Sequence, residues 1–91
     1  MIDEAIRVDD QSVVDMAHWL YRNEGLFVGS SSALNIVAAC IAAKALPEGA
    51  TVVTIICDSG YRHLSRFWNS DYLKTYNLLW PDENVVPKCL Q

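Results

Sequence analysis

Two short polar loops carry the residues whose types and spacing could do chemistry. Each follows an apolar run that predicts a β-strand, residues 26–28 before the first loop and residues 51–57 before the second. In an open parallel sheet, ligands bind beyond the carboxyl ends of the strands, where the first N–H groups of the next helix face the ligand. We therefore expect both loops at one edge of the sheet, lining one crevice with Gly29, Ser30, Ser31, Ser32, Asp58, Ser59 and Gly60.

The elements that must position these loops follow the order helix, strand, helix, strand, helix. Asp9 is a good N-cap with Ser12 at N3, apolar residues follow at spacings of three and four, and Gly25 can take the positive φ that ends a helix. Residues 33–44 are rich in alanine and apolar nearly all round, which predicts a helix buried on most sides. Residues 51–57 are β-branched and continuous, which is typical of a strand buried on both faces of a parallel sheet.

The fold class is therefore α/β, a three-layer, Rossmann-like fragment with a right-handed crossover between parallel strands. Residues 61–69 and 71–76 are expected to be helical or turn-like, and residues 77–91, with two prolines, form an irregular tail. Two strands leave open edges and an uncovered face, whereas independent stability usually needs three or more strands. Unless the tail and the first segment supply the cover, residues 1–91 form one incomplete domain that a missing N-terminal part of the fold or another chain completes.

The composition excludes several classes of protein. With 52% hydrophobic and 20% charged residues, the 91-residue chain is globular, and its net charge of −4 disfavours a nucleic-acid partner. The most apolar stretch, residues 33–46, is shorter than the roughly 20 residues that span a membrane. Cys40, Cys57 and Cys89 form no CxxC pair and no histidine has metal-ligand spacing, so we expect no metal, structural thiols and a reducing, intracellular compartment.

A serine hydrolase is one hypothesis for these loops. The sequence Gly-Ser-Ser-Ser-Ala resembles a degenerate nucleophile elbow around Ser31, and Asp58 and His63 follow in the order serine, aspartate, histidine. Two departures weaken the hypothesis, because Ala33 replaces the second glycine and the two later residues come from one loop. His18 lies off the apolar stripe of the first helix, where we expect it to be solvated.

Two segments of the chain together resemble the C-terminal part of the cysteine synthase family. They are EGLFVGSSSA at residues 24–33 and VVTIICDSGYRHLS at residues 52–65. The family consists of fold type II pyridoxal-phosphate enzymes related to cystathionine β-synthase, and the likeness covers most of the chain, residues 9–72, in a fungal-type variant. Two positions depart from the family pattern, since Ser32 stands where glycine is frequent and Cys57 where proline is frequent.

The resemblance implies how these residues serve the cofactor, pyridoxal 5'-phosphate. Ser59 is expected to hydrogen-bond the pyridine nitrogen, and Gly29 to line the cofactor side of the cleft through its backbone. A neutral hydroxyl cannot hold a proton on that nitrogen as a carboxylate would, which suits β-elimination of a good leaving group. The resemblance also implies a secondary, cleft-lining place for Ser30, Ser31, Ser32, Asp58 and Gly60.

The activity implied is that of a cysteine synthase, which exchanges the acetoxy group of O-acetylserine for sulfide and releases cysteine and acetate. O-Phosphoserine and serine stay open as substrates. The family's Schiff-base lysine has no counterpart in Lys44, Lys74 or Lys88, so the chain alone is expected to be inactive. The family implies an amino-acid substrate and a homodimer in the cytoplasm or mitochondria. The alternative is a non-catalytic interaction module that retains the fold.

Overall fold

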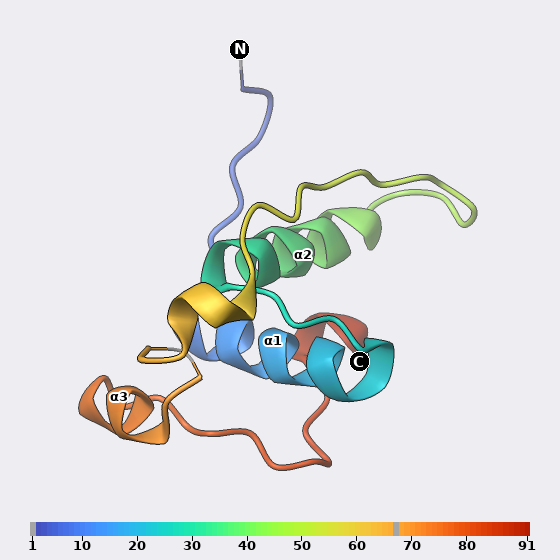
Figure 1. Cartoon of the computed structure of the whole chain (residues 1–91). Coiled ribbons are helices and arrows are strands. Elements are labelled where there is room, and N and C mark those ends of the chain that lie inside the picture. The colour runs from blue at the N-terminus through green and yellow to red at the C-terminus, as the bar shows by residue number, and fades with distance from the viewer. Residues whose placement is uncertain (1, 67) are drawn as a thin grey trace.

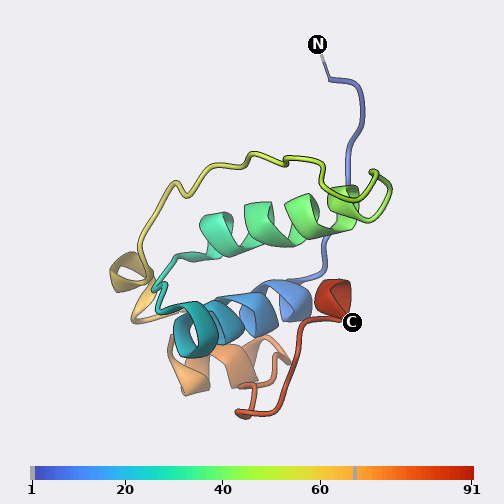
Figure 2. The same ribbon diagram turned by 90° about the vertical axis from the view of Figure 1, so that its right-hand side faces the viewer.

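Two crossed helices form the centre of the molecule. A computed structural model describes residues 2–66 and 68–91. α2 lies over α1, and α3 lies on the other side of α1 (Figures 1 and 2). The C-terminal tail passes below α1 and ends at η2, which contacts α2. Among the described residues, no helix is both long and apolar enough to cross a membrane. The elements in chain order are α1 (Asp10–Glu24), α2 (Ser30–Ala43), the 3-10 helix η1 (Gly60–His63), α3 (Ser70–Thr75) and the 3-10 helix η2 (Lys88–Leu90).

α1 begins and ends where its sequence predicts. The Asp9 carboxylate accepts the N–H of Ser12 at 3.2 Å and its hydroxyl at 2.6 Å, so the N-cap is local. Gly25 adopts a left-handed φ of 68° and donates its N–H to the carbonyl oxygen of Leu20. The predicted apolar face of α1 packs against α2 in a core of Val13, Met16, Ala17, Leu20, Val28, Ala33 and Val37.

α2 is less enclosed than its composition predicts. Within it, Ser32, Ala33 and Val37 are buried, whereas the side chains of Leu34 and Ile41 are 42% and 38% exposed. The prediction of a helix buried on most sides is therefore wrong for this chain. The small residues let one face of α2 approach α1, and its outer face is left exposed.

The predicted parallel sheet is absent from the described residues. Residues 51–57 form no strand and run as an irregular trace over α2 (Figure 2), with Val53 86% and Ile55 69% exposed. The other predicted strand contributes a single antiparallel bridge, between Val28 and Ser59. A strand needs a hydrogen-bonded neighbour along its length, and an apolar run alone does not supply one. The parallel sheet of the predicted α/β, Rossmann-like architecture is thus not formed by residues 2–66 and 68–91.

The C-terminal part of the chain is attached to α1 by side-chain contacts. The segments predicted to be helical or turn-like after residue 60 are found as η1, a following turn and α3. Gln11 makes two hydrogen bonds with the main chain of Leu79, at 2.7 and 3.0 Å, and Arg22 donates to two carbonyl oxygens of the tail. Apart from η2, residues 77–91 contain turns and irregular chain.

The three cysteines are free thiols in two different settings. Cys40 and Cys89 are half-buried against the core, as expected for structural residues. Burial, together with the neighbouring Cys40, raises the pKa of the Cys89 thiol to about 11, which leaves it protonated and unreactive at neutral pH. Cys57, in contrast, is exposed, because the apolar run that contains it is exposed as well.

Candidate cofactor-binding site

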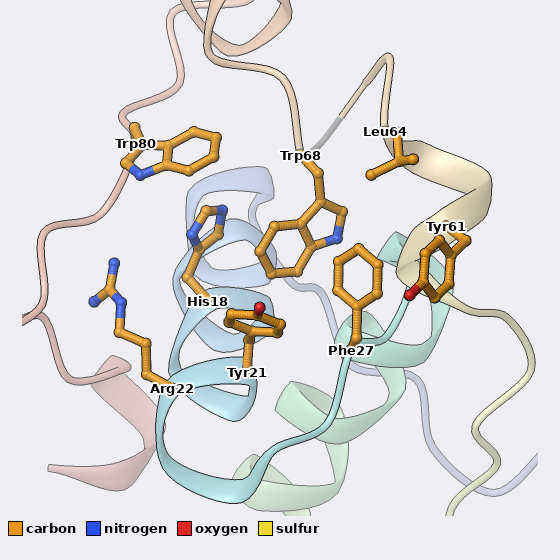
Figure 3. Close-up of a pocket in the computed structure, with 8 residues that line it drawn as sticks. All are labelled: His18, Tyr21, Arg22, Phe27, Tyr61, Leu64, Trp68 and Trp80. Carbon is orange, nitrogen blue, oxygen red and sulfur yellow. The ribbon is translucent and has the colours of Figure 1, made fainter.

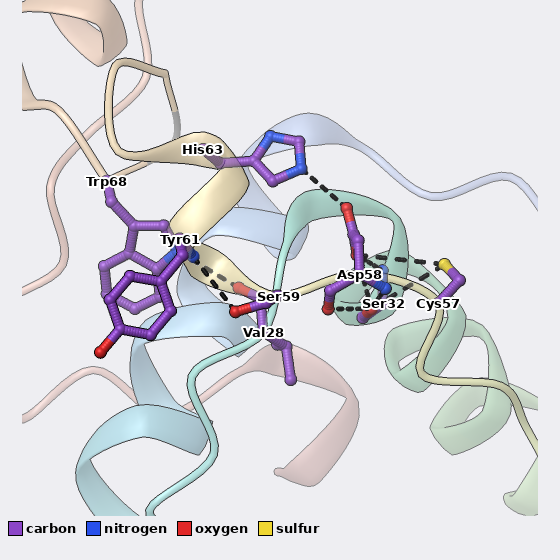
Figure 4. Close-up of polar contacts among 8 residues, drawn as sticks. All are labelled: Val28, Ser32, Cys57, Asp58, Ser59, Tyr61, His63 and Trp68. Atoms are coloured by element: carbon purple, nitrogen blue, oxygen red, sulfur yellow. Dashed lines mark hydrogen bonds and ion pairs between the residues drawn. The ribbon is translucent and has the colours of Figure 1, made fainter.

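The two polar loops lie side by side and are joined by main-chain hydrogen bonds. The N–H of Gly29 donates to the carbonyl oxygen of Asp58 at 3.2 Å, and the N–H of Gly60 donates to that of Phe27 at 3.1 Å. These two bonds flank Ser59, whose main chain forms the antiparallel bridge. The prediction that the loops meet is confirmed, although the segments that bring them together are not parallel strands (Figure 4).

Asp58 makes most of the side-chain contacts between the loops. Its Oδ1 accepts the N–H of Ser32 at 3.1 Å and lies 2.6 Å from Oγ of the same residue. Ser32 Oγ in turn accepts the N–H of Asp58 at 2.9 Å. The other carboxylate oxygen, Oδ2, lies 2.7 Å from Nε2 of His63 (Figure 4). The Asp58 carboxylate therefore joins the first turn of α2 to the last residue of η1.

The Asp58 carboxylate is held in its charged form. Burial raises the pKa of this group, but hydrogen bonds from Ser32 and His63 lower the pKa by more, so that it falls below its usual value of 3.8. Ser32 is the third residue of α2, and its N–H is one of those that a helix leaves without a partner at its N-terminus. The N-cap of α2, Gly29, has no side chain to fill that place. A carboxylate from another segment fills it and meets the positive end of the helix dipole.

Two glycines admit the side chains that pack between the loops. A Cβ at Gly29 would lie within 2.6 Å of the carboxylate carbon and both oxygens of Asp58, and a Cβ at Gly60 would lie within 2.7 Å of three ring carbons of Phe27. Gly29 is buried, and the Asp58 side chain fills the space beside its α-carbon. The geometry thus gives Gly29 a role within the chain, and its place beside a cofactor stays a prediction.

Ser59 has a hydroxyl hydrogen available to donate. The residue is half-buried and extended, with φ −99° and ψ 152°, and it is the N-cap of η1. Its Oγ accepts the N–H of Tyr61 at 3.3 Å. Within residues 2–66 and 68–91, no acceptor is found for the hydroxyl hydrogen itself. A hydroxyl in this state can donate to a neutral aromatic nitrogen, so the residue and its hydrogen bonding fit the role that the family resemblance implies.

The three serines at the start of α2 do not share one environment. Ser32 is fully buried and faces the loop of Asp58 and Ser59. Ser30 is half-buried and Ser31 is exposed. Both lie on a separate hollow of about 170 Å³, which they line with Asp10, Val13 and Leu34. The structure thus brings one of the three predicted serines, Ser32, to the second loop.

A cavity of about 500 Å³ beside η1 was not predicted from the sequence. His18, predicted to be solvated, is only 3% exposed, and its ring stacks on Trp68 with the ring centres 4.3 Å apart. Val14, one helical turn earlier, is fully buried too, so a second stripe of α1 faces inward beside the predicted one. The cavity is lined by His18, Tyr21, Arg22, Phe27, Tyr61, Leu64, Trp68 and Trp80 (Figure 3).

The contacts of Asp58 do not form the arrangement of a serine hydrolase. In that arrangement the imidazole lies between the serine and the carboxylate and takes the proton of the hydroxyl. Here the carboxylate lies between Ser32 and His63, and the buried Ser32 cannot meet a substrate. Ser31, the predicted nucleophile, is exposed and makes no hydrogen bond with Asp58 or His63 among the described residues. The geometry therefore does not support the hydrolase hypothesis.

More than half of the chain matches a known protein family. Residues 1–58 match the family described as pyridoxal-phosphate dependent enzyme. The chain belongs to this family. The resemblance that was inferred from the two loops, including the fold type II relationship, is therefore confirmed at the level of the family.

Within the pyridoxal-phosphate dependent enzymes, the chain is similar to part of several cysteine synthases. It is 54% identical to cysteine synthase 2 of Neurospora crassa over 68 residues, which is 75% of this chain. It is 60% identical over 67 residues, 74% of this chain, to a protein of Saccharomyces cerevisiae that is provisionally named a mitochondrial cysteine synthase. Over 76 residues, 84% of this chain, it is 45% identical to a cysteine synthase of Dictyostelium discoideum. The matches span 15%, 17% and 20% of the length of these relatives.

Proposed function

We propose that this chain forms part of a cysteine synthase, which replaces the acetoxy group of O-acetylserine with sulfide to give cysteine and acetate. The observation that carries the proposal is the Ser59 hydroxyl, which keeps a hydrogen to donate and is held next to the Gly29 loop. Similarity to cysteine synthases supports the substrate class, an amino acid with a good leaving group on its β-carbon.

The role of Ser59 in this proposal is to donate one hydrogen bond to the pyridine nitrogen of the cofactor. Pyridoxal phosphate supplies an electron sink to enzymes of its class. The Ser59 hydroxyl is neutral, so it donates to the nitrogen without holding a proton on it as a carboxylate does. The neighbouring carboxylate of Asp58 is bound by Ser32 and His63 and does not take its place. A cofactor ring without a proton on its nitrogen is a weaker electron sink than a protonated ring. The weaker sink favours elimination from the β-carbon over transamination.

The complete enzyme supplies the parts of the fold and the site that lie outside this chain. Its parallel α/β sheet buries the exposed apolar side chains of residues 51–57 as one strand, with residues 26–28 as another. Polypeptide outside this chain provides the Schiff-base lysine, a loop that binds the phosphate of the cofactor, and a loop that binds the carboxylate of the substrate. The enzyme is a homodimer in the cytoplasm or the mitochondrion. Val53 and Ile55 are exposed in this chain, which supports the proposal that other polypeptide of the complete enzyme covers them.

Replacing Ser59 in the full-length protein tests the proposal. Ser59→Ala removes the donor and is expected to weaken binding of pyridoxal phosphate about fivefold, the contribution of one hydrogen bond. Ser59→Asp is expected to hold a proton on the pyridine nitrogen, which shifts the absorption of the bound cofactor and slows turnover. Equilibrium dialysis, absorption spectra and turnover of O-acetylserine with sulfide measure these effects.

The matched control is Ser70→Ala, at an exposed serine that begins α3 away from both loops. It should leave affinity, spectrum and turnover unchanged. If both Ser59 variants also left all three unchanged, the proposed role of Ser59 would be wrong. A wild-type protein that bound no pyridoxal phosphate and turned over no O-acetylserine would favour the non-catalytic interaction module.

A further inference from the structure

We propose that Asp58 is a positioning residue, which sets the direction of the Ser59 hydroxyl by holding the main chain on both sides of Ser59. The inference rests on the proposed function and deepens it. Asp58 does not act on the cofactor itself in this scheme, because both of its carboxylate oxygens are bound within the chain, to Ser32 and His63.

On the N-terminal side of Ser59, the Asp58 carboxylate binds the first turn of α2, where its Oδ1 accepts the N–H of Ser32 at 3.1 Å. The main chain of residue 58 is held against the same turn. The carbonyl oxygen of Asp58 accepts the N–H of Gly29 at 3.2 Å and lies 2.9 Å from Oγ of Ser32, which also accepts the N–H of Asp58 at 2.9 Å. Gly29 and Ser32 are both buried. Residue 58 therefore cannot shift without breaking several buried hydrogen bonds, each of which is costly to leave unmade.

On the C-terminal side of Ser59, the same carboxylate holds η1. His63 is the last residue of this 3-10 helix, and Ser59 is its N-cap. Asp58 Oδ2 lies 2.7 Å from His63 Nε2, and the two side chains are 16% and 17% exposed, so that water competes less for this hydrogen bond than for one at the surface. Ser59 Oγ accepts the N–H of Tyr61 inside η1, so a movement of η1 redirects the hydroxyl hydrogen.

The extended backbone explains how Asp58 can hold the chain around Ser59 without its own carboxylate blocking the Ser59 hydroxyl. Successive side chains of an extended segment point to opposite faces. The Asp58 carboxylate is directed to α2 and His63, and the next side chain, the Ser59 hydroxyl, is left to face the other way (Figure 4). Gly29 makes room for the carboxylate, since a Cβ there would overlap it.

A double-mutant cycle in the full-length holoenzyme tests the positioning role. Asp58→Ala and Ser59→Ala are each expected to weaken binding of pyridoxal phosphate about fivefold. The double variant should lose no more than Ser59→Ala alone, because Asp58 acts through Ser59. The absorption spectrum of bound cofactor should change in the same way in all three variants. Losses that multiply in the double variant would overturn the inference, since a merely structural role is independent of the hydroxyl.

The conservative variant provides a rescue. Asp58→Asn keeps an oxygen for Ser32 and an amide group that can hydrogen-bond His63, so it should recover affinity to within about twofold of the wild type. Should Asp58→Ala fail to fold, His63→Ala takes its place in the cycle. His63→Ala leaves the contacts between Asp58 and Ser32 intact, and we expect it to lower cofactor affinity about threefold. This loss should again not add to the loss in Ser59→Ala.

Asp9→Ala is the matched control, because Asp9 makes the same pair of contacts with a serine at the start of α1, at 3.2 and 2.6 Å. It should leave cofactor affinity unchanged. If Asp58→Ala bound the cofactor normally while Ser59→Ala bound it weakly, only the positioning role would be overturned. Normal cofactor binding in Ser59→Ala would instead contradict the proposed function.

Discussion

α1 and α2 begin with the same interaction, supplied from different distances along the chain. At α1, the Asp9 carboxylate accepts the N–H of Ser12 at 3.2 Å and its hydroxyl at 2.6 Å. At α2, the Asp58 carboxylate accepts the N–H of Ser32 at 3.1 Å and its hydroxyl at 2.6 Å. Each serine is the third residue of its helix. The cap of α1 comes from three residues away and the cap of α2 from 26 residues away.

The distance decides what each cap depends on. The cap of α1 is complete within one turn of chain and lies at the exposed Asp9. The cap of α2 forms only when the second loop lies against the first, which is the contact that also places Ser59. The start of α2 and the candidate site are therefore stabilised by the same hydrogen bonds, whereas the start of α1 is independent of the site.

The largest expected effect comes from Gly29→Ala, which displaces the distant cap by steric overlap. The added methyl group would lie within 2.6 Å of the Asp58 carboxylate, so the carboxylate has to leave and its hydrogen bonds are lost. We expect the free energy of unfolding of the full-length protein to fall by about 3 kcal/mol in urea titrations. Gly25→Ala is the control, because no described atom lies within 4 Å of its Cβ and only its φ of 68° disfavours alanine, by about 1 kcal/mol. Equal losses would show that Asp58 is not held against Gly29.

A smaller difference is expected between the two carboxylates themselves. Asp58→Ala should cost about 2 kcal/mol and Asp9→Ala about 1 kcal/mol, because Asp58 is more buried and has His63 as a second partner. Hydrogen exchange in the full-length protein separates the caps. Asp58→Ala should speed exchange at the Ser32 amide and Asp9→Ala at the Ser12 amide. Protection of Ser32 that survives Asp58→Ala would mean that something else caps α2.

The smallest expected effect is on acid stability. The Ser12 hydroxyl lowers the pKa of Asp9, and at Asp58 burial raises the pKa while hydrogen bonds from Ser32 and His63 lower it by more. A carboxylate with a lowered pKa in the folded state stabilises the protein fully above its usual value of 3.8 and loses this contribution as the pH falls through the folded pKa.

Asp58→Asn should therefore flatten the loss of stability below about pH 4 by roughly 1 kcal/mol or less. Asp9→Asn should flatten it by less still, because water and salt screen the exposed Asp9 carboxylate. Urea unfolding of the full-length protein over a pH series measures the slope. A variant curve that stays parallel to the wild-type curve would show that the ionised carboxylate does not contribute to that cap.

The amino-acid sequence by itself determined the features that depend on neighbouring residues. The cap of α1 at Asp9, its end at Gly25 and its apolar stripe follow from spacings of three and four residues, at which side chains meet on any helix. The two loop motifs, with Ser59 in the second, were enough to indicate the family. Their contact was expected from a parallel sheet, whereas the described residues make it through a single antiparallel bridge.

Only the tertiary structure decided the features that depend on the path of the chain. A β-branched run such as residues 51–57 indicates an extended segment, but a sheet needs neighbouring strands, and within the described residues none pairs with it. His18 is buried because Trp68 and Trp80 pack on it from distant segments. No local pattern links Asp58 to Ser32, because hydrogen bonds between residues far apart depend on how the whole chain folds.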